Sequence, residues 1–322
     1  MDRAIYLDEN HSTTKVLTKE KPILEQKPEY KLELKLFLPS NAKRKGEGGL
    51  RTKDYFKKSY ANKPLISIVT VVYNGEQHLE QTINSVLDQN YDNIEYIIID
   101  GGSTDGTIEI IKKYEGQIDY WVSEKDNGIY DAMNKGTDVV TGEYLAFLNA
   151  DDWYESDTLT VISDNILEHK RDYFFGNIDV YKNEKYQSTW LPKPQKYKRA
   201  MPIYHPGLFV KTEFLKANKF DTSYRIVSDY EFVIKLILKK KTYVYIPKTL
   251  TCFRDGGISN TQNTLKDKEC FRLQYRYFGL FYASLGYIIG TKKFPISNII
   301  QFFIFTRRKF FIPISEYMYG MM

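Results

Sequence analysis

Short apolar runs alternate with amphipathic segments along the first half of the chain, and this alternation limits the fold more than any other feature of the sequence. The runs are rich in β-branched and aromatic residues, as buried strands are. Between them, apolar residues recur at helical spacing, for example at Leu79, Ile83 and Val86. This pattern predicts parallel βαβ units, hence an α/β fold with a mostly parallel central sheet flanked by helices. The runs lie at residues 65–72, 94–99, 120–123 and 144–148.

The run at residues 144–148 stops abruptly at Asn149 and two adjacent carboxylates, Asp151 and Asp152. In open α/β sheets the ligand crevice lies at the carboxyl ends of the strands. A hard divalent cation takes carboxylate oxygens, and a substrate diphosphate usually completes its shell. The turn is therefore typical of a site for a metal ion and a phosphate. A surface turn that caps a helix is the alternative, since Asp is common in both roles.

Asp100 ends the second run and is followed by the sequence GGSTDGT. Gly101 and Gly102 let the backbone approach a ligand, and residues 103–105 can cap the next helix. The segment lacks the GKS or GKT ending of a P-loop and the GxGxxG fingerprint of a dinucleotide-binding fold. Both of these phosphate-binding loops are therefore excluded.

Polar side chains also follow the third run, around Gly128, where a helix begins. The amino terminus of that helix favours an anion, so its polar residues are candidates for ligand contact. An ordinary amphipathic helix with solvated charges is the competing interpretation. The polar residues are Glu124, Asp126, Asn127, Asp131, Asn134 and Lys135.

The composition is that of a globular protein. The chain has 322 residues, of which 42% are hydrophobic, enough for one large domain or two. A net charge of +5 is too small to establish a nucleic-acid partner. Cys252 and Cys270 show neither metal-ligand nor disulfide spacing, which fits a reducing cytosol. The amino terminus has no apolar segment of the signal-peptide type, so we expect a cytoplasmic location.

Residues 1–62 are dense in Lys and Glu and predict an N-terminal extension. Within it, residues 31–39 alternate as an edge strand does. Residues 46–59, GEGGLRTKDYFKKS, join glycines to a cationic cluster. We expect a flexible, solvated arm there, and an approach of the cluster to a phosphate is the less favoured alternative.

The second half of the chain continues the strand and helix pattern. A helix is predicted to begin near Asp229, and His205 precedes a turn and a further strand. A lone His is more often structural than functional. Further strands are predicted at residues 174–181, 186–191, 243–246 and 250–253.

Four segments, in this order, resemble the successive motifs of the family 2 nucleotide-sugar glycosyltransferases. They are ISIVTVVYN, IIIDGGSTDGT, NGIYDAMNKG and GEYLAFLNADD. The resemblance covers residues 64–257 with normal spacing, so it is specific as a set. It implies a GT-A fold, with the glycosyltransferase domain at residues 63–262 between the N-terminal extension and a C-terminal helical segment at residues 263–322.

The resemblance also implies roles for individual residues. The acids after the fourth strand are expected to hold Mn²⁺ or Mg²⁺ on the donor diphosphate, with Asp152 preferred over Asp151 for direct ligation. Asp229 resembles the general base that takes the acceptor hydroxyl proton in an inverting transfer, with Glu231 as the nearby alternative. A capping role for Asp229 is also open. The implied donor-binding residues are Thr70, Tyr73, Asn74, Asp100, Asp131, Asn134, Asp151, His205 and Arg254.

Arg254 opens the segment FRDGGIS, which resembles a flexible loop that closes over the donor. An ordinary surface turn is the alternative. The chain also departs from the family pattern twice. Gly101 stands where the family often has an acid that contacts a uracil, and Asn149 stands where a further acid is common. The first departure leaves the donor base open, and the second lowers the charge at the metal site.

The C-terminal stretch is basic and aromatic. Its uncharged windows, residues 277–291 and 294–306, are shorter than the roughly 18 to 20 residues of a spanning helix. They suit interfacial helices on an anionic cytoplasmic leaflet, near a lipid-linked acceptor. A helical cap on the catalytic domain or a dimer surface is the alternative.

Taken together, these features predict a metal-dependent, inverting glycosyltransferase that moves a sugar, most simply from a UDP-sugar, to a saccharide acceptor in surface polysaccharide assembly. Sugar transfer to a polyprenyl phosphate is one alternative. A non-catalytic module that binds nucleotide sugars is another. Nucleic-acid binding through the basic C-terminal stretch ranks last.

Overall fold

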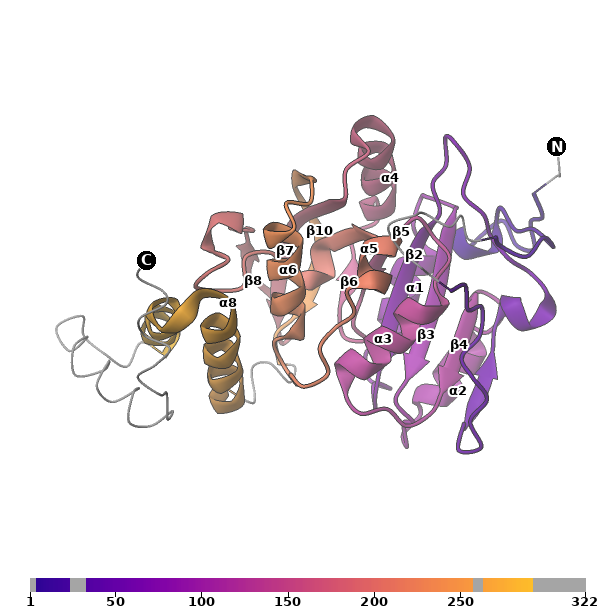
Figure 1. Ribbon diagram of the computed structural model, residues 1–322. Helices are drawn as coiled ribbons and strands as arrows, with labels where there is room; N and C mark the ends of the chain where they lie inside the picture. Colours follow the sequence, from indigo (N-terminus) through magenta and orange to yellow (C-terminus); the bar gives the residue numbers. More distant parts are fainter. Residues whose placement is uncertain (1–3, 24–32, 257–262, 292–322) are drawn as a thin grey trace.

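The computed structural model describes residues 4–23, 33–256 and 263–291. In this part of the chain a ten-stranded sheet runs in the order β1-β4-β3-β2-β5-β9-β7-β10-β6, and β8 pairs with β7 (Figure 1). Its strands are β1 Gly46–Gly48, β2 Ile66–Val72, β3 Ile94–Asp100, β4 Tyr120–Ser123, β5 Tyr144–Phe147, β6 Trp153–Tyr154, β7 Tyr173–Lys182, β8 Lys185–Trp190, β9 Leu208–Lys211 and β10 Tyr243–Arg254.

The central strands are parallel, as the sequence predicts. β2 pairs in parallel with β3 and with β5, β3 pairs in parallel with β4, and β7 pairs in parallel with β10. The helices between the strands also lie where the apolar spacing predicts them. They are α1 Leu79–Leu87, α2 Thr107–Lys113, α3 Ile129–Val139, α4 Thr158–His169, α5 Thr212–Ala217, α6 Ser228–Leu238 and α8 Asn263–Thr291, with short 3-10 turns at Ser12–Thr14 (η1), Leu50–Lys53 (η2), Pro194–Lys196 (η3) and His205–Gly207 (η4).

Two apolar cores lie on the two faces of the sheet. One packs α1, α2 and α4 against residues such as Ile68 and Ile98 of the sheet, and the other packs α3, α5 and α6 against residues such as Val69 and Ile99. Because side chains alternate between the faces of a strand, a strand covered on both sides is buried at every position. β2 and β3 are buried in this way, and most of their residues are apolar.

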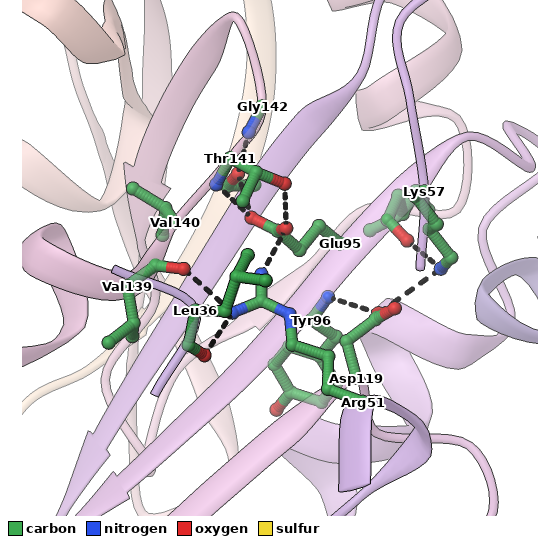
Figure 2. Close-up of polar contacts among 12 residues, drawn as sticks. Leu36, Arg51, Lys57, Glu95, Tyr96, Asp119, Val139, Val140, Thr141 and Gly142 are labelled. Atoms are coloured by element: carbon green, nitrogen blue, oxygen red, sulfur yellow. Dashed lines mark hydrogen bonds and ion pairs between the residues drawn. The ribbon is translucent and has the colours of Figure 1, made fainter. Parts of the chain in front are cut away.

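Residues 46–59 do not form the solvated arm that we expected. β1 adds to the sheet edge by antiparallel pairing with β4, and Leu50 and Phe56 are each only 2% exposed. Two cations of the segment also reach the interior. Figure 2 shows Arg51 paired with Glu95, and Lys57 paired with Asp119 at 3.1 Å. The charges that suggested a solvated arm are therefore those that fasten the segment to β3 and β4.

The Arg51 guanidinium is held on several sides. It donates hydrogen bonds to the carbonyl oxygens of Val139, at 2.7 Å, and Leu36, at 3.0 Å, and its partner Glu95 accepts one from the Thr141 N–H, at 2.8 Å (Figure 2). A buried ion pair needs such additional partners to offset the loss of water. The cluster lies near the amino end of β3, away from the strand ends where a ligand is expected.

Two strand predictions need correction. Residues 33–39, the described part of the predicted strand at 31–39, form no strand. The strands predicted at 243–246 and 250–253 are one strand, β10, because its pairing with β7 shifts register between Tyr245 and Thr249 and so accommodates Pro247.

The first part of α8 caps α6. Leu273 is fully buried in a cluster with Tyr230 and Ile234, and the backbone turns at Gly279, whose φ is +78°. This favours the helical-cap interpretation for the described part of the C-terminal segment. Among the described helices, none combines the length and the apolar character of a membrane span. The predicted window at 294–306 and residues 257–259 of the predicted closing loop lie outside the described residues.

Candidate active site

The carboxyl ends of β2, β3 and β4 lie level with one another. Val72 is paired with Asp100, and Asp100 with Ser123, so the loops that follow these three strands share one edge of the sheet. The end of β5 joins them through the Leu148 N–H, which donates to the Val69 carbonyl at 3.0 Å. The strand order turns back at β2, because β3 and β4 lie on one side of it and β5 on the other. Such a switch point is where open α/β sheets bind ligands.

Asp100 is completely buried, and its carboxylate holds the loops of this edge together. It accepts hydrogen bonds from the Ser103 N–H, at 3.0 Å, and from the hydroxyls of Ser103 and Ser123. Thr70 is also fully buried and bonds to the Tyr96 hydroxyl at 3.0 Å. The structure therefore places these two predicted donor-binding side chains inside the protein, where they shape the loops.

Tyr73 and Asn74 follow β2 directly. The Tyr73 side chain is 65% exposed. Asn74 has a left-handed backbone, with φ of +51°, and its side chain accepts the Thr104 N–H at 2.9 Å. The Asn74 backbone N–H donates to the Ser103 hydroxyl at 2.7 Å. Among the predicted donor-binding residues in these two loops, Tyr73 and Asn74 are both exposed, and Tyr73 presents an aromatic ring.

The two acids after β5 differ in exposure. Asp152 is fully buried, and it accepts hydrogen bonds from the Arg254 N–H, at 3.1 Å, and the Asn149 amide, at 3.3 Å. Asp151 is only partly buried. Burial raises the pKa of both carboxyl groups, and the neighbouring Asp151 raises that of Asp152 further. A pair of carboxylates in this setting favours a bound cation.

A chain of polar contacts connects this acidic turn to α6. The Asn149 amide nitrogen lies 3.3 Å from Nε2 of His205, and Nδ1 of His205 lies 3.2 Å from the Asp229 carboxylate. The other Asp229 oxygen lies 2.9 Å from the Tyr130 hydroxyl, whose single proton also faces the Ile226 carbonyl oxygen at 2.7 Å. The two histidine contacts fit an arrangement in which Nδ1 of His205 donates to Asp229 and Nε2 accepts from the Asn149 amide.

That arrangement leaves the side-chain amide oxygen of Asn149 free. It is buried and has no hydrogen-bond partner among the described residues. An unsatisfied buried acceptor beside two carboxylates is what a hard cation would complete. The oxygen donors of Asn149, Asp151 and Asp152 therefore suit Mg²⁺ or Mn²⁺. The described residues contain no group of three or more His, Cys, Asp or Glu side chains arranged as metal ligands.

Arg254, at the end of β10, borders the acidic turn. Besides its backbone contact with Asp152, its side chain donates to the Asp151 carbonyl at 3.2 Å and to Gln81 at 2.7 Å, and it pairs with Glu184. His78 lies close enough to Arg254 and Asp151 to feel their charges, although burial is the larger cause of its lowered pKa. Both residues flank the place where a phosphate would approach.

Three further candidates have structural partners. The Asn134 side chain exchanges two 3.0 Å hydrogen bonds with the backbone of Phe220. Asp131 accepts the Asn127 N–H at 2.9 Å, at the start of α3. Glu231, the alternative base, is 1% exposed and pairs with Lys235 at 2.8 Å, so it faces away from Asp229. These residues fasten helices rather than line the acidic turn.

Tyr130 and His78 are the site neighbours that the sequence analysis missed as candidates. Tyr130 stands in the NGIYDAMNKG segment between polar positions, and its hydroxyl faces α6 only in the folded protein. Asp126, one of the polar residues singled out before α3, lies against Gly101.

Comparison with known proteins identifies the family. The model of "Glycosyl transferase family 2" matches residues 67–227, half of the chain. The chain belongs to glycosyltransferase family 2. It is a glycosyltransferase, and the resemblance seen in its motifs is confirmed.

Among relatives of this glycosyltransferase, the "PGL/p-HBAD biosynthesis glycosyltransferase" of Mycobacterium bovis is 30% identical over 215 residues, 64% of this chain and 82% of the relative. The "Putative teichuronic acid biosynthesis glycosyltransferase TuaG" of Bacillus subtilis is 42% identical over 101 residues, 30% of this chain and 40% of the relative.

Solved structures confirm the GT-A fold of this glycosyltransferase. S. aureus TarS 1–349, in complex with UDP-GlcNAc, superposes with a TM-score of 0.56 at 17% identity, covering 73% of this chain and 74% of TarS. The mannosyltransferase PcManGT from Pyrobaculum calidifontis, in complex with GDP-Man and Mn²⁺, gives a TM-score of 0.55 at 15% identity, with 76% of each chain covered.

Proposed function

We propose that this glycosyltransferase transfers a sugar, with inversion, from a nucleotide diphosphate donor to a hydroxyl of a saccharide acceptor. The observation that carries the proposal is the contact chain from Asp152 through Asn149 and His205 to Asp229. It connects the acidic turn, the proposed site for a cation and a phosphate, through two side chains to the Asp229 carboxylate at the start of α6. Donor activation and acceptor activation need these two sites next to each other.

Asp229 is the proposed general base. Its side chain is 18% exposed, so an acceptor hydroxyl can approach it, while His205 and Tyr130 fix its orientation. As the acceptor oxygen bonds to the anomeric carbon, the bond from that carbon to the diphosphate oxygen breaks, and the hydroxyl proton passes to Asp229. This single displacement inverts the anomeric centre and needs no covalent intermediate.

Asp151, Asp152 and Asn149 are the proposed metal-holding residues. The greater exposure of Asp151 and the internal hydrogen bonds of Asp152 favour Asp151 for the direct contact, which reverses the order of preference drawn from the sequence. A bound Mn²⁺ or Mg²⁺ supplies charge neutralisation of the leaving diphosphate. Arg254 and His78 border the same place and add hydrogen-bond donors from the protein.

The proposed acceptor is a growing, lipid-linked saccharide of bacterial surface polysaccharide or glycolipid assembly. The names of the mycobacterial and Bacillus relatives support this setting. The basic and aromatic sequence after residue 270 supports a position at the inner face of the cell membrane, where such acceptors are anchored.

The proposal is tested by release of nucleoside diphosphate from a panel of nucleotide sugars, with Mn²⁺, with Mg²⁺ and with EDTA. We expect slow hydrolysis of one donor that requires the metal and falls at least about 100-fold in Asp151→Ala. The matched variant Asp138→Ala, changed at an acid of α3 that pairs with Lys219, retains the activity. Donors that bind but are not turned over, even with membrane extract as a source of acceptor, would favour a binding module instead.

A further inference from the structure

A groove lies at the end of α6 that is far from Asp229. It has a volume of about 570 Å³, within the range of pockets that bind small ligands. Tyrosines of the neighbouring strands β7 and β10 line it, together with the end of α6 and residues 192–197. Because a helix rises about 1.5 Å per residue, Ile237, which lines the groove, lies about 12 Å along α6 from Asp229. The groove is therefore separate from the acidic turn and from the proposed base.

Two tyrosine rings of the groove are fixed in place and yet largely exposed. Tyr243 packs on Tyr173, with ring centroids 5.3 Å apart. Tyr245 stacks on Phe175 at 5.6 Å, and its hydroxyl donates to the Asn177 side chain at 2.7 Å. Tyr243 is 48% exposed and Tyr245 is 39% exposed. Rings held in this way can pack against the C–H faces of sugar rings, and little side-chain freedom is lost when the ligand binds.

The sequence around the groove is positively charged. The residues that line it, except Tyr173, lie in two segments, 185–212 and 232–254. Each of these segments contains six Lys or Arg residues and no acid. A hollow bordered by charge of one sign attracts a ligand of the opposite sign.

Two of these cations line the groove itself. They are Lys240 and Lys241, and within the described part of the chain neither of them forms an ion pair. The acid that precedes β7, Asp172, is already engaged, because it accepts the Thr242 N–H at 2.8 Å and pairs with Lys211 at 3.3 Å. The two lysines are therefore available for an acidic ligand.

We propose that this groove is a second saccharide site, which holds an acidic unit of the acceptor glycan while the end of the same glycan reaches Asp229. The inference rests on the proposed function and names the class of acceptor, a glycan that carries uronate or phosphodiester groups. The tyrosines pack on its sugar rings, and the lysines bind its acidic groups. Tyr230 connects the two sites, because its hydroxyl donates to the Tyr197 carbonyl at 2.7 Å and so holds residues 192–197 against α6.

The shape and lining of the groove favour a glycan over other anionic partners. A membrane surface is bound by apolar side chains that protrude, whereas these rings line a hollow. An inorganic phosphate chain would use the lysines and leave the rings without a role. A single-stranded nucleic acid could use both features, so it is one of the competitors in the test.

The test measures dissociation constants by calorimetry on the full chain, with hexagalacturonate, neutral maltohexaose, polyphosphate and oligouridylate as probes. We expect hexagalacturonate to bind tightest to the unchanged protein. Lys240→Asn/Lys241→Gln should weaken its binding about 3- to 30-fold, the effect of two partly exposed charges. Asn suits position 240, where φ is +52°. Tyr243→Ala should weaken hexagalacturonate about 3- to 10-fold and leave polyphosphate unchanged.

The end of α4 offers a matched control, because Lys170, with φ of +48°, and Arg171 also follow a helix and are both exposed. Lys170→Asn/Arg171→Gln should bind hexagalacturonate as the unchanged protein does. Tyr186→Ala is the control for the loss of an exposed ring, since Tyr186 is 54% exposed and does not line the groove. Thermal unfolding shows whether each variant is folded.

Hexagalacturonate binding that is unchanged in the folded groove variants, or that falls equally in the control variants, would overturn the inference. Failure of the unchanged protein to bind hexagalacturonate, or tighter binding of polyphosphate or oligouridylate, would overturn it too. Donor hydrolysis by the groove variants should stay at the level of the unchanged protein, so these outcomes leave the proposed function standing. Hexagalacturonate binding without turnover of any donor would count against the proposed function alone.

Discussion

At the scale of single residues, the hydroxyl of Tyr130 offers a clean test of how Asp229 is held. It lies 2.9 Å from the Asp229 carboxylate and 2.7 Å from the Ile226 carbonyl oxygen, and Tyr130 is 5% exposed. Tyr130→Phe removes that donor with almost no change of shape. We expect kcat to fall about tenfold with little change in the donor KM, because the base becomes less well oriented.

Tyr154→Phe is the matched control for this prediction. Tyr154 is also buried, but its hydroxyl has no hydrogen-bond partner among the described residues. Steady-state kinetics of the two variants, with thermal unfolding to confirm that both are folded, separate a catalytic effect from a packing effect. Equal kcat values in Tyr130→Phe and Tyr154→Phe would remove the positioning role of Tyr130.

The raised pKa values of Asp151 and Asp152 predict a pH dependence for metal binding. Because burial raises both values, these carboxyl groups keep their protons to higher pH than ordinary Asp, and a cation competes with those protons. Without the metal, the same shift makes the fold lose stability as pH rises through the raised pKa values. We therefore expect Mn²⁺ with UDP to raise Tm more at pH 7.5 than at pH 5.

Thermal unfolding with and without Mn²⁺ and UDP, at several pH values, measures this effect. Asp151→Asn, which cannot ionise at this position, should lose most of the increase in Tm at pH 7.5. An increase that is the same at both pH values, or one that survives in Asp151→Asn, would speak against these carboxylates as the metal site.

At the scale of elements, the segment that carries β1 and η2 is fastened by a buried ion pair. Arg51 and Glu95 are 2% and 1% exposed, so Arg51→Met leaves a carboxylate buried without its partner. Such a change costs about 3–5 kcal/mol of unfolding free energy. We expect Arg51→Met/Glu95→Gln to be more stable than Arg51→Met alone, because the unpaired charge is removed together with its partner.

Urea unfolding of these variants measures the difference. Lys53→Met is the control from the same 3-10 turn, since Lys53 is 54% exposed and 3.9 Å from Glu115, and an exposed pair of this kind contributes about 0–1 kcal/mol. A loss of less than about 1 kcal/mol in Arg51→Met would mean that the segment is not held by this pair.

Most elements of the sheet could be predicted from the sequence, because their apolar periodicity is local. The segment at residues 46–59 could not. Its Lys, Arg and Gly residues are typical of solvated loops. The acids that pair with its buried cations are Glu95 in β3 and Asp119 directly before β4. Only the folded sheet brings those charges together. The continuity of β10 was missed for a similar reason, since Pro247 predicts a break that the register shift against β7 avoids.

At the scale of the whole molecule, the site joins residues that are far apart in sequence. Asn149, His205 and Asp229 contact one another across 80 positions of the chain. The sequence analysis names each of them in a separate segment, and only the resemblance to the family predicts that they belong to one site. The position of the Asp126 carboxylate beside Gly101 could not be predicted in this way, because neither periodicity nor spacing indicates which side chain lies against a given backbone position.

The charge distribution along the chain leads to a prediction about membranes. Residues 270–322 contain seven Lys and Arg residues and one acid, Glu316. We expect the full-length protein to float with vesicles that contain anionic lipid and to stay behind with purely zwitterionic ones. A variant with Arg307, Arg308 and Lys309 each changed to Glu should lose this binding. Equal binding of the variant and the unchanged protein would contradict a membrane role for these bases.

The most direct test of the proposed mechanism compares Asp229→Asn with the unchanged protein on the donor that the panel identifies. The account predicts that Asp229→Asn binds this donor with unchanged affinity but transfers sugar at least about 1,000-fold more slowly, whereas Glu231→Gln stays within about threefold. Transfer by Asp229→Asn at the rate of the unchanged protein would contradict the assignment of the base, and with it the mechanism proposed here.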